Sequence, residues 1–182
     1  MTLRISVHGL HERIVSRNPA LLQGSPRLWY TPSVRVYLDL CCLKRPFDLQ
    51  EQAIVRLQTE AVLSILALPS ETVELLRSQA HLLENSLNPV QSRREAVALW
   101  LSGRPPTVPA EIETSTRIEE LVAKGFKSFD AFHLTCAELS GATVFLSVDI
   151  RLLRLAARLT RELRVRVADP VHFVEEIAQW TH

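Results

Sequence analysis

Short apolar segments alternate with longer stretches of helical periodicity from Val34 onward. The segment RVYLDL is rich in β-branched and aromatic residues and predicts a strand that ends at Asp39. After a loop at 45–48, the apolar residues of 54–66 recur at helical spacing. They predict an amphipathic helix with Asp48 as its N-cap and Pro69 beyond its end.

The second half of the chain repeats this alternation. The apolar run TVFLSV predicts a strand buried on both faces, which is typical of the centre of a parallel sheet. Ser78 and Ser128 are predicted to cap helices, and Gly125 and Gly141 to end them. Further strands are expected at 72–76, 143–148 and 165–167, and further helices at 79–87, 90–101, 111–124, 130–139, 150–163 and 171–180.

This order of elements predicts the fold class and the domain limits. Short strands that alternate with helices favour parallel pairing, hence a three-layer α/β/α sandwich with a short central sheet. Residues 34–182 are predicted to form this domain. Residues 1–33 contain prolines and glycine but no long helical period, so we interpret them as an irregular N-terminal extension. They hold four arginines and one glutamate, a net charge of +3, which offers an RNA-binding arm as the alternative.

Composition excludes several classes of protein. The chain has 47% apolar and 23% charged residues, which excludes general disorder, and a net charge of +1 gives no overall basic field. It has no apolar run of about 18 residues and no signal-peptide core, so we expect a cytoplasmic protein without a membrane partner. The three cysteines have no spacing typical of a zinc site.

Carboxylates follow two of the predicted strands. Asp39 ends the first strand and Asp149 follows the central one, while Asp130 opens a helix and Glu84 lies within another. Ligands of open parallel sheets bind at the carboxyl ends of the strands, so these side chains are expected to converge. Such carboxylates repel each other unless a cation lies between them, and oxygen ligands select Mg²⁺ or Mn²⁺. The alternative is ordinary capping of strand and helix ends.

Three sequence blocks together resemble a PIN domain. They are VYLDLCCLKRPFD, HLLENSLNP with SRRE, and KSFDAFHLTCAELSGATVFLSVDIRLL, and the resemblance runs from about Val34 to Glu176. PIN domains are compact α/β nucleases that cut RNA with Mg²⁺ or Mn²⁺, and many are the toxin of a VapC-type toxin–antitoxin pair. The resemblance therefore implies a metal-dependent endoribonuclease, with RNA as substrate and an antitoxin protein and a second copy of the chain as further partners.

The resemblance also implies roles for individual residues. It assigns the catalytic and metal-binding carboxylates to Asp39, Glu84, Asp130 and Asp149. Ser147 matches the hydroxyl residue that often precedes the last aspartate. The chain departs from the family pattern at Leu40, where a small hydroxyl residue is common, and at Ile150, where a second acid is common. We therefore expect Asp39 to lack a hydrogen bond and a second metal site to be weak.

Three further residues and the function of the chain each have more than one interpretation. Arg45, Arg93 and His133 are candidates for contact with RNA, although a solvated surface explains the arginines and helix packing explains the histidine. One alternative function is a catalytically impaired PIN domain that binds RNA or protein. Another is a phosphatase-like α/β domain with Asp39 as nucleophile, but such sites usually have a DxD motif, which Leu40 and Cys41 do not provide.

Overall fold

The computed structural model describes residues 34–102 and 111–180. Its centre is a parallel sheet of β1 (Val34–Leu38), β2 (Val73–Leu76), β3 (Val144–Leu146) and β4 (Arg166–Ala168), in the order β2-β1-β3-β4. The predicted N-terminal extension at 1–33 lies outside the described residues. Because the order reverses between β1 and β3, the sheet has the kind of edge at which open α/β sheets bind ligands.

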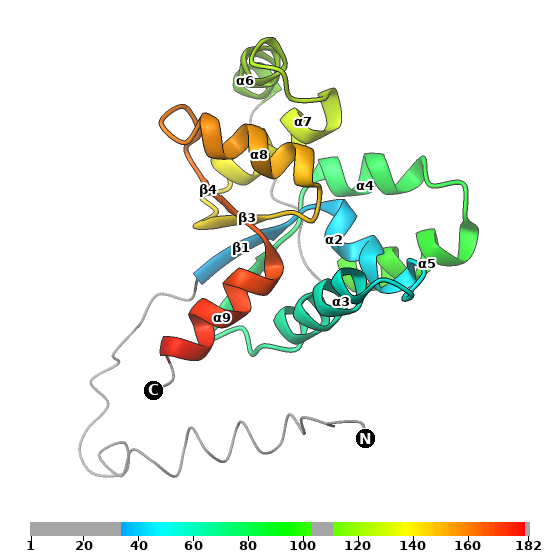
Figure 1. Ribbon diagram of the computed structural model, residues 1–182. Helices are drawn as coiled ribbons and strands as arrows, with labels where there is room; N and C mark the ends of the chain where they lie inside the picture. The colour runs from blue at the N-terminus through cyan, green and yellow to red at the C-terminus, as the bar shows by residue number, and fades with distance from the viewer. Residues whose placement is uncertain (1–33, 103–110, 181–182) are drawn as a thin grey trace, which may run out of the picture.

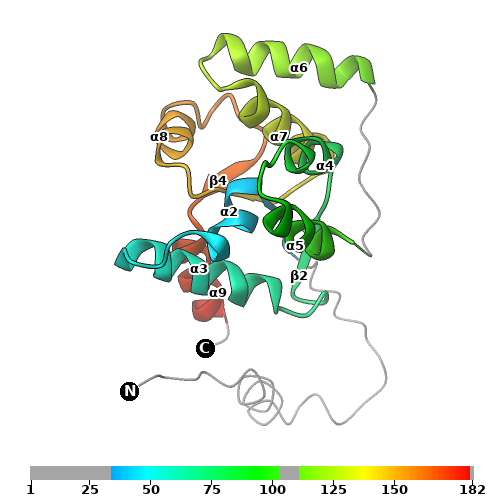
Figure 2. The ribbon, with the colours of Figure 1, turned by 90° about the vertical axis from the view of Figure 1, so that its right-hand side faces the viewer.

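Helices cover both faces of the sheet (Figure 1). The view in Figure 2 shows α3 and α9 on one side and α6, α7 and α8 on the other. The helices are α2 (Leu40–Lys44), α3 (Ala53–Leu66), α4 (Gln79–Ser86), α5 (Gln91–Leu101), α6 (Glu111–Ala123), α7 (Ser128–Leu139), α8 (Ile150–Arg158) and α9 (Pro170–Trp180).

Successive side chains along a strand point to opposite faces of the sheet, and the protein therefore has two hydrophobic cores. Val36 and Leu38 of β1 face a core that contains Phe173 of α9, together with residues of α3 and α5. Tyr37 and Phe145 face the opposite way, into a core with α7 and α8. Both central strands are therefore buried on both faces, as the apolar run TVFLSV predicts. The three-layer α/β/α class is confirmed.

The segment after β1 differs from the sequence prediction. Leu40–Lys44 forms the short helix α2, and Arg45–Phe47 continues it as a 3-10 turn in place of the expected loop. The prediction that Asp48 caps the next helix is wrong, because α3 begins at Ala53 with Gln52 as N-cap. The Asp48 carboxylate instead binds Arg45, 3.0 Å away.

Three further boundaries are corrected. Ser128 is the first residue of α7, and Lys127 occupies the cap position. The predicted helix at 150–163 ends at Arg158, and the predicted strand at 143–148 is limited to Val144–Leu146. Of the described helices, none has the length and apolar character needed to cross a bilayer.

Candidate metal centre

Four carboxylates meet at the carboxyl ends of β1 and β3. They come from four separate segments: the residue after β1, helix α4, the first turn of α7 and the N-cap of α8. They lie close enough together that the charges of the other three carboxylates add to the effect of burial and raise the pKa of Asp130. We call this group the acidic cluster; its members are Asp39, Glu84, Asp130 and Asp149.

Asp39 is buried and held by two donors. It is 5% exposed, and its Oδ2 accepts hydrogen bonds of 2.8 Å from Ser147 Oγ and from Cys41 Sγ. Burial raises the pKa of the Cys41 thiol, so the sulfur keeps the proton that it donates. The hydrogen bond that Leu40 cannot supply thus comes from the next residue, because α2 turns Cys41 back toward Asp39. Both donors reach Oδ2, and Oδ1 accepts no hydrogen bond from the described residues.

Glu84 is fixed at both oxygens. Lys44 Nζ lies 3.1 Å from Oε1, and His133 Nε2 lies 2.8 Å from Oε2. Burial opposes the charged form of Glu84, but the bonds from His133 and Lys44 outweigh it and hold the pKa of this carboxyl below its usual value. Glu84 is therefore charged and pointed at the cluster rather than at solvent.

A buried chain of hydrogen bonds supports His133 from behind. The Tyr37 hydroxyl lies 2.7 Å from His133 Nδ1 and 2.6 Å from Ser78 Oγ. Since the Glu84 carboxylate is an acceptor, His133 Nε2 donates to it, and Nδ1 accepts from the hydroxyl of Tyr37. Burial raises the pKa of Tyr37, which keeps this hydroxyl protonated. The imidazole thus has one orientation and one tautomer set by its neighbours.

His81 anchors the far end of this chain. Its Nε2 donates to the Leu38 carbonyl over 2.7 Å, and its Nδ1 accepts from the Ser78 amide over 3.1 Å. Burial lowers the pKa of His81 to about 3, and a proton on His133 would lower it further, so this ring is neutral. The network therefore ties the end of β1 to the start of α4, the two elements that carry Asp39 and Glu84.

Asp130 and Asp149 occupy the more open side of the cluster. Burial raises the pKa of Asp130 to about 7, and the nearby charges of the other three carboxylates add to this effect. Asp149 Oδ1 caps α8 by accepting from the amides of Arg151 and Leu152, at 2.8 and 3.2 Å. The capping alternative thus describes one oxygen of Asp149, while its Oδ2 lies 3.9 Å from Lys127 Nζ.

The residues present suit a divalent cation. One ligand atom each of Asp39, Glu84 and His133 lies within 4.8 Å of the others. Asp130, which repulsion disfavours as an anion, borders the same group. A cation placed among these side chains would relieve the repulsion between the carboxylates, which adds to the larger effect of burial on the pKa of Asp130. Carboxylate oxygens suit Mg²⁺ and Mn²⁺ alike, while both nitrogens of His133 are already engaged by Glu84 and Tyr37.

Two arginines that are candidates for RNA contact have partners within the protein. Arg45 and Arg93 both bind the Asp48 carboxylate, at 3.0 and 3.6 Å. Arg93 also donates to the Phe47 carbonyl over 2.6 Å. These bonds tie the segment after α2 to α5, so the arginines hold this turn in place.

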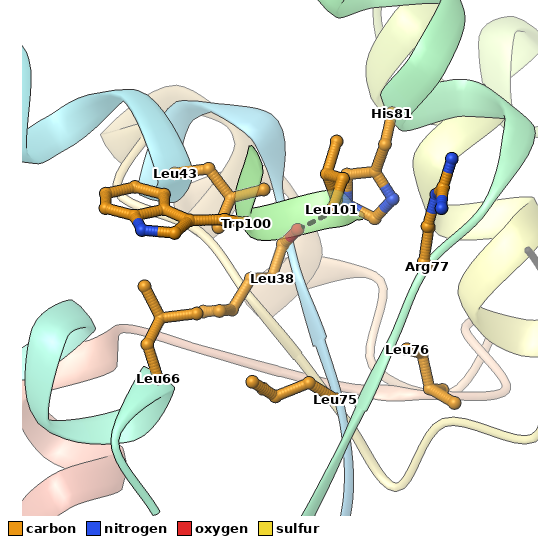
Figure 3. A pocket seen from close by; sticks show the side chains of 9 residues that line it. All are labelled: Leu38, Leu43, Leu66, Leu75, Leu76, Arg77, His81, Trp100 and Leu101. Carbon is orange, nitrogen blue, oxygen red and sulfur yellow. Dashed lines mark hydrogen bonds between the residues drawn. The ribbon is translucent and has the colours of Figure 1, made fainter. Parts of the chain in front are cut away.

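A small cavity is lined by Leu38 at the end of β1 and by His81 (Figure 3). Its volume is about 20 Å³, close to that of a single water-sized sphere, which is far too small for a nucleotide. The hydrogen bond from His81 to the Leu38 carbonyl joins two of its lining residues. Its lining is mostly apolar: Leu38, Leu43, Leu66, Leu75, Leu76, Arg77, His81, Trp100 and Leu101. It is a gap in packing rather than a substrate site.

Removal of the Tyr37 hydroxyl tests the supporting network. Tyr37→Phe leaves His133 Nδ1 without its buried partner, which costs about 1–3 kcal/mol, while Ser78 Oγ still accepts from the backbone amide of His81. In a chain of this size that lowers Tm by roughly 2–10 °C. Differential scanning calorimetry checks this value. Ser86→Ala, which removes an exposed hydroxyl from α4, is the control, and an equal shift in both variants would contradict the role of the network.

The chain is similar in structure to a solved protein, although its sequence matches no family model. No curated protein gives a significant match either. Among solved structures, the chain is similar to FitAcB from Neisseria gonorrhoeae, with 16% sequence identity and a TM-score of 0.48. The similarity covers 75% of this chain and 99% of that chain.

Proposed function

We propose that this chain is a PIN-like endoribonuclease that hydrolyses RNA phosphodiester bonds at the acidic cluster with the help of Mg²⁺ or Mn²⁺. The observation that carries the proposal is the convergence of four carboxylates, from four segments, at the carboxyl edge of a parallel sheet. The sequence resemblance to PIN domains assigns the same four residues. An antitoxin partner is part of this proposal and follows from that resemblance.

The side chains have distinct tasks in this mechanism. A divalent cation, when bound, would neutralise charge on the scissile phosphate and promote attack by water. Asp39 offers Oδ1 to such an ion because Ser147 and Cys41 fix its other oxygen. The Lys44 ammonium, beside Glu84, also lies where it can approach a phosphate oxygen. Since the chemistry uses water, no side-chain nucleophile is required, and the buried Asp39 is poorly placed for a phosphatase-like role.

Metal dependence tests this function directly. A fluorescently labelled single-stranded RNA should be cleaved with Mg²⁺ or Mn²⁺ and remain intact in excess EDTA. Cleavage should return when the metal is restored, because the chelator removes only the ion. Undiminished cleavage in EDTA would contradict the proposed mechanism.

One observation favours the alternative of an impaired PIN domain that binds RNA or protein. Lys44 and His133 together occupy both oxygens of Glu84, and Ile150 stands where a further acid is common. Calorimetric titration with Mn²⁺ separates the two functions when combined with the cleavage assay. A chain that binds RNA but neither binds metal nor cleaves would support the alternative.

A further inference from the structure

A row of arginines lies along α8 and begins at the acidic cluster. Arg151, Arg154 and Arg158 occupy positions i, i+3 and i+7, which share one stripe of a helix. Their side chains are exposed, and so is that of Arg161 in the turn that follows. At 1.5 Å per residue, the helical part of the row is about 10 Å long. We call these four residues the α8 arginine row.

Three of the four arginines in this row have no ion-pair partner among the described residues. Residues 150–161 contain four arginines and no acidic residue, so they carry +4 in a chain of net charge +1, and all other residues together carry −3. Arg154, Arg158 and Arg161 form no ion pair with any residue that the structure describes. Arg35 and Arg166, by contrast, are each bound by a glutamate. The guanidinium groups of Arg154, Arg158 and Arg161 are therefore available to a ligand.

The opposite face of α8 excludes a lipid surface as its natural ligand. Leu152 and Ala156 are 1% and 2% exposed and pack into the core beside β3. A basic helix that lies on a membrane needs an apolar face to insert. In α8 that face is already used by the core, and only the charged stripe is left for a partner.

We propose that the α8 arginine row binds successive phosphates of the RNA strand whose scissile bond lies at the acidic cluster. This inference rests on the proposed function. Arg151 links the two regions, since its guanidinium lies 3.6 Å from Asp130 Oδ2 and it follows the capping Asp149 by two residues. Arginine presents a planar fork of donors that matches phosphate oxygens. The strand therefore leaves the cluster along α8, where the positive stripe offsets the repulsion between RNA and the carboxylates.

Salt-dependent binding tests this proposal. Arg154→Gln, Arg158→Gln and the double variant are titrated against a fluorescein-labelled single-stranded oligouridine in EDTA, where a metal-dependent nuclease cannot cut. Removing one arginine–phosphate ion pair should make the slope of log K against log salt shallower by about 0.7 and weaken binding most at low salt. The change in slope should be about twice as large for the double variant as for either single variant.

Arg166→Gln is the matched control, because it removes the same charge at the start of β4, the end of the sheet opposite the cluster. Its salt slope should equal that of the wild type. Equal slopes in all variants, or binding to phosphatidylserine vesicles or a polyglutamate peptide but not to RNA, would overturn the inference. Binding that depends on α8 without cleavage in any metal would contradict only the proposed function. Metal-dependent cleavage with binding independent of α8 would contradict only the arginine row.

Discussion

Asp39→Asn is expected to lower RNA cleavage by about 100-fold or more while the fold is retained. The substitution keeps size and shape, and the amide oxygen can still accept the hydrogen bonds from Ser147 and Cys41. What it removes is a negative charge at the centre of the acidic cluster. Cleavage of labelled RNA with Mg²⁺, followed over time on denaturing gels, measures the decrease. Circular dichroism and Tm report whether the fold is intact.

Asp48→Asn provides the matched comparison. Asp48 is also a paired aspartate near α2, but it binds Arg45 and Arg93 and lies outside the cluster. This variant should cleave RNA at close to the wild-type rate. If Asp39→Asn cleaves as fast as Asp48→Asn, the cluster is not the catalytic site, whatever metal the reaction needs.

The metal-free protein is expected to lose stability as pH rises from about 4 to about 7, through Asp130. Its pKa is raised to about 7 by burial first and by the neighbouring carboxylates next. The Arg151 guanidinium, 3.6 Å away, opposes this shift, but its side chain is 59% exposed and well screened. The folded state thus holds this proton more tightly than the unfolded state, so the stabilisation is complete below pH 4 and is lost through pH 7.

Asp130→Asn removes this dependence because the amide does not titrate. In EDTA at pH 8 the variant should be more stable than the wild type by about 2 kcal/mol, roughly half of what the full pKa shift corresponds to because the site is partly open to solvent, and Tm should rise by roughly 4–8 °C. At pH 4 the two should melt together. Mg²⁺ should raise Tm of the wild type at pH 8 more than that of the variant, since ion binding relieves the same repulsion. Glu176→Gln, which neutralises a carboxylate of α9 away from the cluster, should show no gain at pH 8, and a gain equal to that of Asp130→Asn would contradict this account.

The helical spacing of apolar residues and the β-branched and aromatic content of the strand segments were sufficient to predict the sheet and most helices. The apolar run around Phe145 predicted a doubly buried strand, and Gly125 and Gly141, both with positive φ, stand where two helices end. Asp39 and Asp149 could be placed at one edge because parallel strands bring their carboxyl ends together. A helix or strand of ordinary length thus contains enough repeats of its apolar pattern to be predicted from a single sequence.

The helix α2 could not be predicted in this way, since five residues contain little more than one turn and show no period. Because α2 was not predicted, Cys41 and Lys44 were not identified as site residues. Both depend on α2 to reach the cluster. The prediction that Asp48 caps a helix was wrong because its carboxylate binds two arginines, one of them from the distant α5.

His133 can be linked to the site from its spacing in the sequence, whereas Tyr37 cannot. His133 lies three residues after Asp130, a spacing that places both on one face of α7 and that made the histidine a candidate for contact with RNA. Tyr37 belongs to a strand whose alternation predicts burial but not the partner of its hydroxyl. Such pairings are made between distant segments and are fixed only by tertiary packing.

The pairing of β1 with β3 has a consequence for the order of events during synthesis. Val36 lies beside Val144, so more than half of the chain must be made before the two strands can meet. Contacts that close so long a loop form late and slowly, because the loss of chain entropy precedes any gain from pairing. Asp39 and Glu84 leave the ribosome long before Asp149. A nascent or truncated chain therefore lacks an assembled acidic cluster, and the carboxylates come together only when the C-terminal third has been translated and has joined the sheet.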